Sequence, residues 1–480
     1  MVTTIKQVLC GAAVAGLVAG TGSATGTPIA YVGPSALDWV LAAEHVLLIG
    51  TDGTNLDKIL QYAYTDDSGF KTAMDEGVTG AATMVNHTTI SGPSWSTILT
   101  GVWDDKHGVI NNLFDPQPYT NWPTVFNLLE YHDPAIDTSV IADWDYINDI
   151  AASGGYPADN NTFVPFDTSW ADTDAQVTAD TVGKIQDIAA NPDVSSFLFS
   201  YQVQVDEAGH AFGGGSTEYA QAVTNVGANI QQIMEAVAAA RAVTGDDWTV
   251  IITTDHGHQQ SLGFGHGFQS PNETSSFVIF DLAGDHANEG SQNLHYATVD
   301  ITPTILQIFG VPLRSDFDGV PMQSDPAVLN SIVDPVNLKQ ALSDAISMFG
   351  YPNIGNDIAL GIRTVFTSIP YFIDGFVTDI DKYLQTIVDE HIFLLSGLAE
   401  VAQQIVRFSG GLMVDATEAL ARGVAYLTGA GVIPPTDPPL PLPPGLLDAA
   451  VLADNDFYTP DQLPVDSELP SLLDATALLS

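Results

Sequence analysis

The sequence predicts an α/β fold: a three-layer domain with a largely parallel central sheet, followed by a C-terminal helical extension. Between residues 45 and 281, short apolar runs alternate with longer amphipathic stretches. Alternation of strand and helix at this scale is typical of parallel sheets covered by helices. The alternation stops after residue 325, and helical periodicity dominates up to residue 432.

The apolar runs indicate where the strands lie. We expect strands within 45–53, 138–145, 195–204, 248–257 and 275–281, and helices at about 172–191 and 216–243. In open parallel sheets, ligands bind beyond the carboxyl ends of the strands. Residues that directly follow these runs are therefore the first candidates for a functional site.

The ends of the chain differ from its middle. One lysine precedes a mostly apolar stretch at 8–19, and small residues follow, which is the pattern of a secretory signal peptide. We therefore expect four parts and a secreted or cell-envelope location: a leader 1–30, a catalytic domain 31–325, a helical extension 326–432, and a Pro-rich linker with an acidic tail 433–480. The single cysteine, Cys10, lies in the leader, so disulfides, Cys-ligated zinc and a thiol nucleophile are excluded from the exported chain.

The charge is strongly acidic, with 58 Asp and Glu against 12 Lys and Arg and a net charge of −46. Such a surface repels nucleic acid, so a nucleic-acid scaffold is excluded as a partner. A high-salt habitat and an acidic exported protein both fit this composition. Charged residues interrupt every long apolar stretch of 326–432, so we expect no transmembrane span there.

Acids and histidines gather after the predicted strands. They are Asp52 in GTDGT, Asp206 and His210 in VDEAGH, Asp255 and His256 in TTDHGH, and His266 in GFGHG. Carboxylate and imidazole together suit zinc, and carboxylate also suits manganese. An Asp before a Gly also fits a plain turn, and D-x-x-x-H also fits a solvated helix face. The order of the motifs and their positions at strand ends favour a metal site.

A nucleophile stands in TISGPSWSTILTG. Pro93 favours the first turn of a helix, which places Ser91 at the helix N-terminus, where unpaired N–H groups attract a phosphate oxygen. A plain N-cap serine is the alternative.

Over about 44–312, the chain resembles the alkaline phosphatase superfamily, and within it the type I phosphodiesterase / nucleotide pyrophosphatase branch. The resemblance is carried by five motifs in this order: TDGT, SGPSWSTILTG…HGVINN, VDEAGH, TTDHGH and GHG. The resemblance implies a metal-dependent phosphoric ester hydrolase that acts on a small-molecule ester through a phospho-serine. It also implies two zinc ions, for which other divalent cations can substitute. By this likeness Ser91 is the nucleophile and Asn111 donates to a phosphate oxygen. One zinc would be held by Asp52, Ser91, Asp255 and His256, and the other by Asp206, His210 and His266.

The chain departs from the branch at the substrate. Gly92 stands where nucleotide-cleaving members carry one stacking aromatic, while Tyr201 matches the second, so we expect Gly92 and Tyr201 to contact substrate. His258 and His295 are not assigned to the ligand set. Lys106 is the one basic residue beside the motifs.

Several functions stay open at this point. We expect diesters to be preferred, because an alkaline phosphomonoesterase needs a further cation, for which Lys106 is the candidate. A sulfatase is less favoured, since Trp95 stands where the sulfatase signature S-x-P-S-R requires Arg. A non-catalytic metal-binding envelope module is a third alternative, with cell-envelope association through 326–432.

Overall fold

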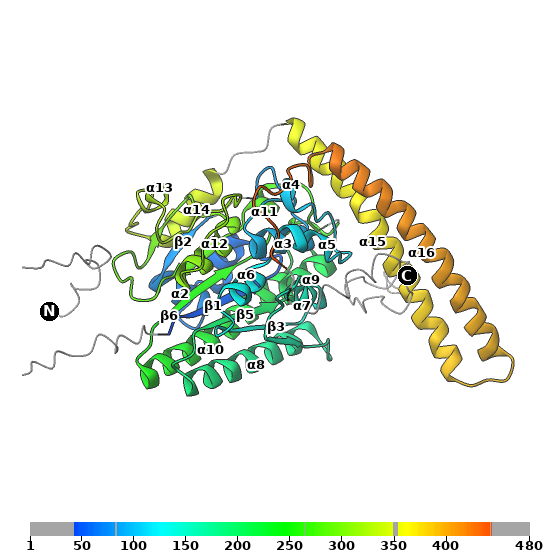
Figure 1. Cartoon of the computed structure of the whole chain (residues 1–480), viewed down its shortest axis with the longest axis horizontal. Coiled ribbons are helices and arrows are strands. Elements are labelled where there is room, and N and C mark those ends of the chain that lie inside the picture. Colours follow the sequence, from blue (N-terminus) through cyan, green and yellow to red (C-terminus); the bar gives the residue numbers. More distant parts are fainter. Residues whose placement is uncertain (1–42, 82–83, 264, 349–353, 442, 444–480) are drawn as a thin grey trace, which may run out of the picture. The chain divides into compact units, whose positions relative to one another are not determined.

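The computed structural model describes residues 43–81, 84–263, 265–348, 354–441 and 443 (Figure 1). The expected leader and the expected acidic tail lie outside the described residues. The expected location and the boundaries of the four parts therefore stay predictions.

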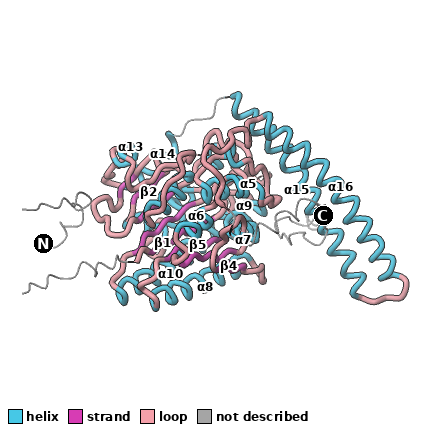
Figure 2. The backbone as a smooth tube through the Cα atoms, viewed as in Figure 1, coloured by secondary structure: helices cyan, strands magenta, loops and turns pink. Residues whose placement is uncertain are grey.

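The described residues form an eight-stranded sheet in the order β4-β3-β5-β1-β6-β7-β2-β8. Its strands are drawn in magenta in Figure 2. β1 pairs in parallel with β5 and β6, whereas β7 runs antiparallel to β6 and β2, so the sheet is largely parallel, as predicted. The five expected strands appear as β1, β3, β5, β6 and β7. The strands are β1 (His45–Thr51), β2 (Val78–Gly80), β3 (Asp137–Ala142), β4 (Asn160–Phe163), β5 (Ser196–Gln202), β6 (Trp248–Thr253), β7 (Val278–Asp281) and β8 (Ser291–Gln292).

Helices cover both faces of the sheet. Side chains alternate along β1 because successive residues of a strand point to opposite faces. Val46 and Leu48 pack in one buried cluster with α3, α6, α7 and α12, and Leu47 and Ile49 in another with α2, α8, α10 and α14. This confirms the three-layer architecture. The helical elements of the domain are α1 (Leu56–Lys58), the π-helical η1 (Ile59–Ala63), α2 (Gly69–Glu76), α3 (Ser91–Thr100), α4 (Asp104–His107), α5 (Gln117–Asn121), α6 (Val125–His132), α7 (Asp145–Ala152), α8 (Trp170–Ala190), α9 (Gln204–Phe212), α10 (Thr217–Thr244), α11 (Pro271–Thr274), the 3-10 turn η2 (Thr298–Asp300), α12 (Ile301–Ile308), α13 (Pro326–Leu329) and α14 (Leu338–Met348).

Two long helices, α15 (Ile354–Asp389) and α16 (Leu395–Leu427), run side by side as a hairpin (Figure 1). Gly410 leaves room for Val377, and Arg407 forms an ion pair with Asp381. The predicted C-terminal helical extension is thus confirmed. α14 buries Leu338 in the core of the sheet, whereas the hairpin packs chiefly on itself. No described helix combines the length and the apolar content needed to cross a membrane.

Candidate metal centre and nucleophile

Three neighbouring strands deliver the acids of the site. Asp52 directly follows β1, Asp255 follows β6 at the second position, and Asp206 lies in the first turn of α9, just after β5. Because β5, β1 and β6 are adjacent and parallel, their carboxyl ends meet at one edge of the sheet. All three carboxylates are buried there.

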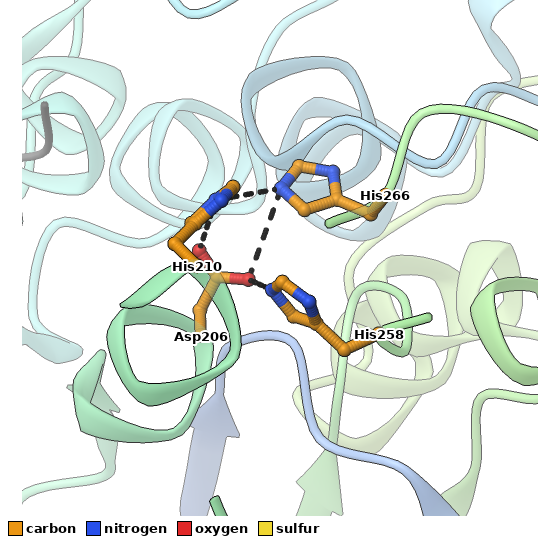
Figure 3. A group of neighbouring side chains, drawn as sticks. All are labelled: Asp206, His210, His258 and His266. Carbon is orange, nitrogen blue, oxygen red and sulfur yellow. Dashed lines mark hydrogen bonds and ion pairs between the residues drawn. The ribbon is translucent and has the colours of Figure 1, made fainter. Parts of the chain in front are cut away.

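The first group consists of Asp206, His210, His258 and His266, and their ligand atoms all lie within 4.8 Å of one another (Figure 3). Asp206 and His210 are one helical turn apart on α9, and His210 Nε2 is 3.2 Å from Asp206 Oδ2. His266 Nε2 lies 3.0 Å from His210 Nε2 and 3.8 Å from Asp206 Oδ1. The structure therefore brings together the three residues that the resemblance assigned to one zinc.

His258 joins this group although the sequence analysis did not assign it. Its Nε2 lies 2.7 Å from Asp206 Oδ1, and its side chain is fully buried. The side chain of Asn55 holds the backbone in place, accepting from His258 N at 2.6 Å and donating to His258 O at 3.0 Å. In the sequence, the only sign that His258 belongs to the site is that it follows His256 and Gly257 directly. This sign is weak, because the Asn55 contact that holds His258 in place is not visible in the sequence.

The second group consists of Asp52, Asp255 and His256. His256 Nε2 is 3.2 Å from Asp255 Oδ2 and 3.8 Å from Asp52 Oδ1. Ser91 Oγ lies 3.2 Å from the same His256 nitrogen, so the candidate nucleophile borders this group.

Two aromatic side chains support Asp52. Tyr201 donates from its hydroxyl to Asp52 Oδ2 at 2.5 Å, and Trp95 donates from Nε1 to the same oxygen at 2.7 Å. Both rings are fully buried. Tyr201 therefore orients a candidate ligand and offers no open face for the stacking expected of it, because its ring is enclosed. Trp95, at the sulfatase arginine position, has the same role.

The two groups are contiguous. The imidazole of His256 stacks on that of His266 with ring centroids 3.9 Å apart. Gly53 directly follows Asp52 and has a φ of +58°. A Cβ at this position would overlap the Asp206 side chain. Only glycine satisfies both constraints at low cost, so the Gly of the TDGT motif lets the carboxylates of Asp52 and Asp206 approach.

The electrostatics of the site call for cations. Burial, with the charge of Asp206 added, raises the pKa of Asp52 to about 7, and burial raises the pKa of Asp255 well above its usual range. Burial also opposes ionisation of Asp206, but its three histidine neighbours hold its pKa well below the usual range. Among the described residues, Asp52 Oδ1 and Asp255 Oδ2 are buried without a hydrogen-bond partner. Buried oxygens of this kind are costly, and a bound divalent cation would satisfy them.

Ser91 is the first residue of α3, and Gly92 and Asn111 lie beside it. Gly92 N donates to Asn112 Oδ1 at 2.8 Å, and a Cβ on Gly92 would meet Asn111 O. Asn111 Nδ2 donates to Glu418 Oε2 at 2.9 Å and to Thr367 O at 3.1 Å, both in the hairpin. The hairpin thus contacts the site through Asn111. Neither the spacing of residues nor the motifs in the sequence indicated this contact.

Two other residues lie apart from these groups. Lys106 Nζ donates to Asp316 O at 2.7 Å and to Asp318 Oδ1 at 2.6 Å, so its charge is already paired. His295 is exposed and belongs to neither metal-ligand group.

An α/β sheet with two acid–histidine groups and a hydroxyl at its carboxyl edge offers the side chains that metal-dependent hydrolases use. Residues 46–266 match the model of the type I phosphodiesterase / nucleotide pyrophosphatase family. The match confirms the family resemblance, and the chain is a hydrolase of phosphoric ester bonds. The matched range contains every candidate residue from Asp52 to His266.

Solved structures of low identity are also similar to this chain. A phosphonate monoester hydrolase from Silicibacter pomeroyi has 15% identity, over 61% of this chain and 78% of that one, with a TM-score of 0.43. A protein in the alkaline phosphatase superfamily from Vibrio parahaemolyticus has 12% identity, over 59% and 70%, with a TM-score of 0.44. A 2-O GAG sulfatase has 14% identity, over 60% and 75%, with a TM-score of 0.45.

Proposed function

We propose that the chain hydrolyses phosphodiesters with two zinc ions bound, through a phospho-Ser91 intermediate. The observation that carries this proposal is the position of Ser91 Oγ, 3.2 Å from His256 Nε2, beside two contiguous acid–histidine groups. A hydroxyl at the N-terminus of a helix, next to candidate ligands, combines a nucleophile with groups that attract phosphate.

The residues present fit the two cations. Asp52, Asp255 and His256, with Ser91, would hold one, and Asp206, His210 and His266 the other. Zinc suits this mixture of imidazole and carboxylate, and another divalent cation could substitute. When bound, the two ions would acidify the Ser91 hydroxyl and offset the charge on the leaving oxygen.

The chain's own groups would position the phosphate. Asn111 exchanges one of its two present acceptors, and Gly92 N–H exchanges Asn112, for a phosphate oxygen, and these donors stabilise the charge that develops there. Ser91 Oγ releases its proton to solvent and bonds to phosphorus as the bond to the leaving oxygen breaks, and the leaving group takes a proton from solvent and departs as an alcohol. Water then cleaves the phospho-Ser91 ester, and a phosphomonoester is released.

The charges around Asn111 support a preference for diesters. Glu418 Oε2 contacts Asn111, and the nearby Arg422 is shared between Glu418 and Asp115. With Lys106 also paired, the described residues offer no unpaired cation beside Asn111. A monoester dianion would meet more repulsion here than a diester monoanion. The leader pattern at 1–30 supports a secreted or cell-envelope location for this activity.

The test compares kcat/KM on bis-p-nitrophenyl phosphate, p-nitrophenyl phosphate and p-nitrophenyl sulfate. We expect the diester to be cleaved best, and Ser91→Ala to lose at least about 1,000-fold in kcat. Ser343→Ala, at an exposed serine of α14, is the matched control and should keep full activity. Full activity of Ser91→Ala would falsify the nucleophile, and a preference for the monoester or the sulfate would overturn the substrate class. Elemental analysis should find two zinc ions per chain; less than one divalent ion would refute the metal assignment.

A further inference from the structure

The α15–α16 hairpin has a core of its own and contacts the α/β domain through the N-terminal half of α15 and the C-terminal end of α16. Val377 and Gly410 pack at its centre. At its base, Arg363 forms an ion pair with Asp104, and Thr364 donates to Gly267 O, next to the candidate ligand His266. The hairpin therefore buries the sides of its helices that face each other and the α/β domain, and it leaves other apolar residues exposed to solvent.

The solvent side of α15 carries a continuous apolar stripe. Its members recur every three or four residues up to Phe376, and Tyr383 follows two turns later, so they lie on one face of the helix. Their exposed fractions range from 36% at Ile369 to 79% at Ile354. The stripe consists of Ile354, Ile358, Ile362, Val365, Ile369, Phe372, Phe376 and Tyr383.

The solvent side of α16 repeats the pattern with alternating spacings of three and four residues. Its members, each at least 53% exposed, are Leu398, Val401, Ile405, Phe408 and Leu412. Such spacing matches the a and d positions of a heptad, whose partner is another helix. A helix that is apolar on several sides is normally buried on several sides.

The charges of the hairpin disfavour a lipid surface as the partner. Helices that lie on membranes usually carry free Lys and Arg on their polar face. Here Arg363, Arg407 and Arg422 are each paired with an acid of this chain, and the exposed Lys382 is the one other Lys or Arg of the two helices. A partner helix whose apolar residues have the same three- and four-residue spacing fits these stripes better than a lipid surface does.

We propose that the α15 stripe pairs with the α15 stripe of a second copy, so that two hairpins form an intermolecular helical bundle. If the α15 stripes of the two copies covered each other, each copy would bury on the order of 1,000 Å² of surface. A standard stable interface buries about 800 Å² per partner. A two-fold interface is isologous, so the centre of a self-paired stripe meets its own copy. The centre of the α15 stripe is Ile369.

The first test measures the mass of the full chain by sedimentation and light scattering. We expect a dimer that strengthens with salt, because screening reduces repulsion between two acidic chains while apolar burial persists. Ile369→Asp with Phe376→Asp should weaken dimerisation by at least about 100-fold, since each buries an unpaired charge. Val243→Asp, at an exposed apolar residue of α10, is the control and should remain a dimer. Circular dichroism and ester hydrolysis confirm that the variants are folded.

The second test is oxidative cross-linking in a Cys10→Ser background, which removes the only native cysteine. Ile369→Cys should form an intermolecular disulfide several-fold faster than Phe393→Cys, which lies beyond the stripe. A monomeric wild type at high salt, or a dimer that survives both aspartates, would overturn the proposal. Sedimentation of the monomer with phosphatidylcholine vesicles, abolished by the same aspartates, would instead assign the stripe to lipid.

Discussion

His258 Nε2 lies 2.7 Å from Asp206 Oδ1, and both side chains are buried. The imidazole N–H donates to the carboxylate, which fixes the direction in which Asp206 presents its other oxygen. Asp206 is the residue around which His210 and His266 gather. His258 is therefore a positioning residue for the candidate metal group.

We predict that His258→Ala weakens metal binding by about 10- to 100-fold, the usual loss when a partner of a metal ligand is removed. Competition with a chromogenic chelator measures the affinity without any need for activity. His295→Ala, at an exposed histidine outside the site, is the control and should bind metal as the wild type does. An unchanged affinity of His258→Ala would show that Asp206 is held by its other neighbours alone.

Tyr201→Phe tests the support of Asp52. Removal of the hydroxyl leaves Asp52 with one fewer donor, and a hydrogen bond to a charged group contributes about 1.5–3 kcal/mol. We therefore expect lower metal affinity and a lower kcat on every ester. KM should change equally for nucleotide and non-nucleotide diesters, because the ring is buried. A KM increase confined to nucleotides would restore the stacking role that the sequence suggested.

Glu418→Gln tests the charge beside Asn111. Loss of one negative charge should raise kcat/KM on p-nitrophenyl phosphate by about 5-fold, on the order of 1 kcal/mol, and change the diester value less. Glu400→Gln, at an exposed acid of the same helix, is the control. Equal changes on both substrates would mean that Glu418 affects access to the site and not the charge of the substrate.

Asp104 links α4 to the hairpin through Arg363. Burial opposes its charge, but the hydrogen bond to His87 and the charge of Arg363 hold the pKa of Asp104 well below its usual range. As pH falls, the unfolded chain binds this proton first, so the pair stabilises the fold above about pH 4 and its contribution is lost below. Asp104→Asn should lower stability by about 3 kcal/mol at pH 7.

The measurement for this pair is the thermal midpoint of wild type and Asp104→Asn from pH 7 to pH 3. The difference between them should shrink toward the acid end. The exposed Asp344→Asn serves as the control. A difference that stays constant over this range would indicate that the carboxylate is not ionised in the folded state.

Local patterns in the sequence determined the order of the main strands and the acids that follow them. Apolar runs bounded by turn residues predicted β1, β3, β5, β6 and β7, and Asp52, Asp206 and Asp255 lie at their ends. Such features depend on side-chain period and turn chemistry, which adjacent residues encode. The strands β2, β4 and β8 were not predicted, because β2 and β8 have only three and two residues and β4 (NNTF) is exposed and mostly polar, so none of them forms an apolar run.

Only the tertiary structure decided which residues distant in sequence contact one another. His258 reaches Asp206 because Asn55, 203 residues away, holds its backbone, and Tyr201 faces inward to Asp52. The Asn111–Glu418 contact spans 307 residues. Periodicity can show that a side chain is buried or polar, but the partner it meets depends on the packing of whole elements. The sequence therefore predicted the metal-ligand motifs and the helical extension, but not the contacts that orient the ligands or the placement of the hairpin beside them.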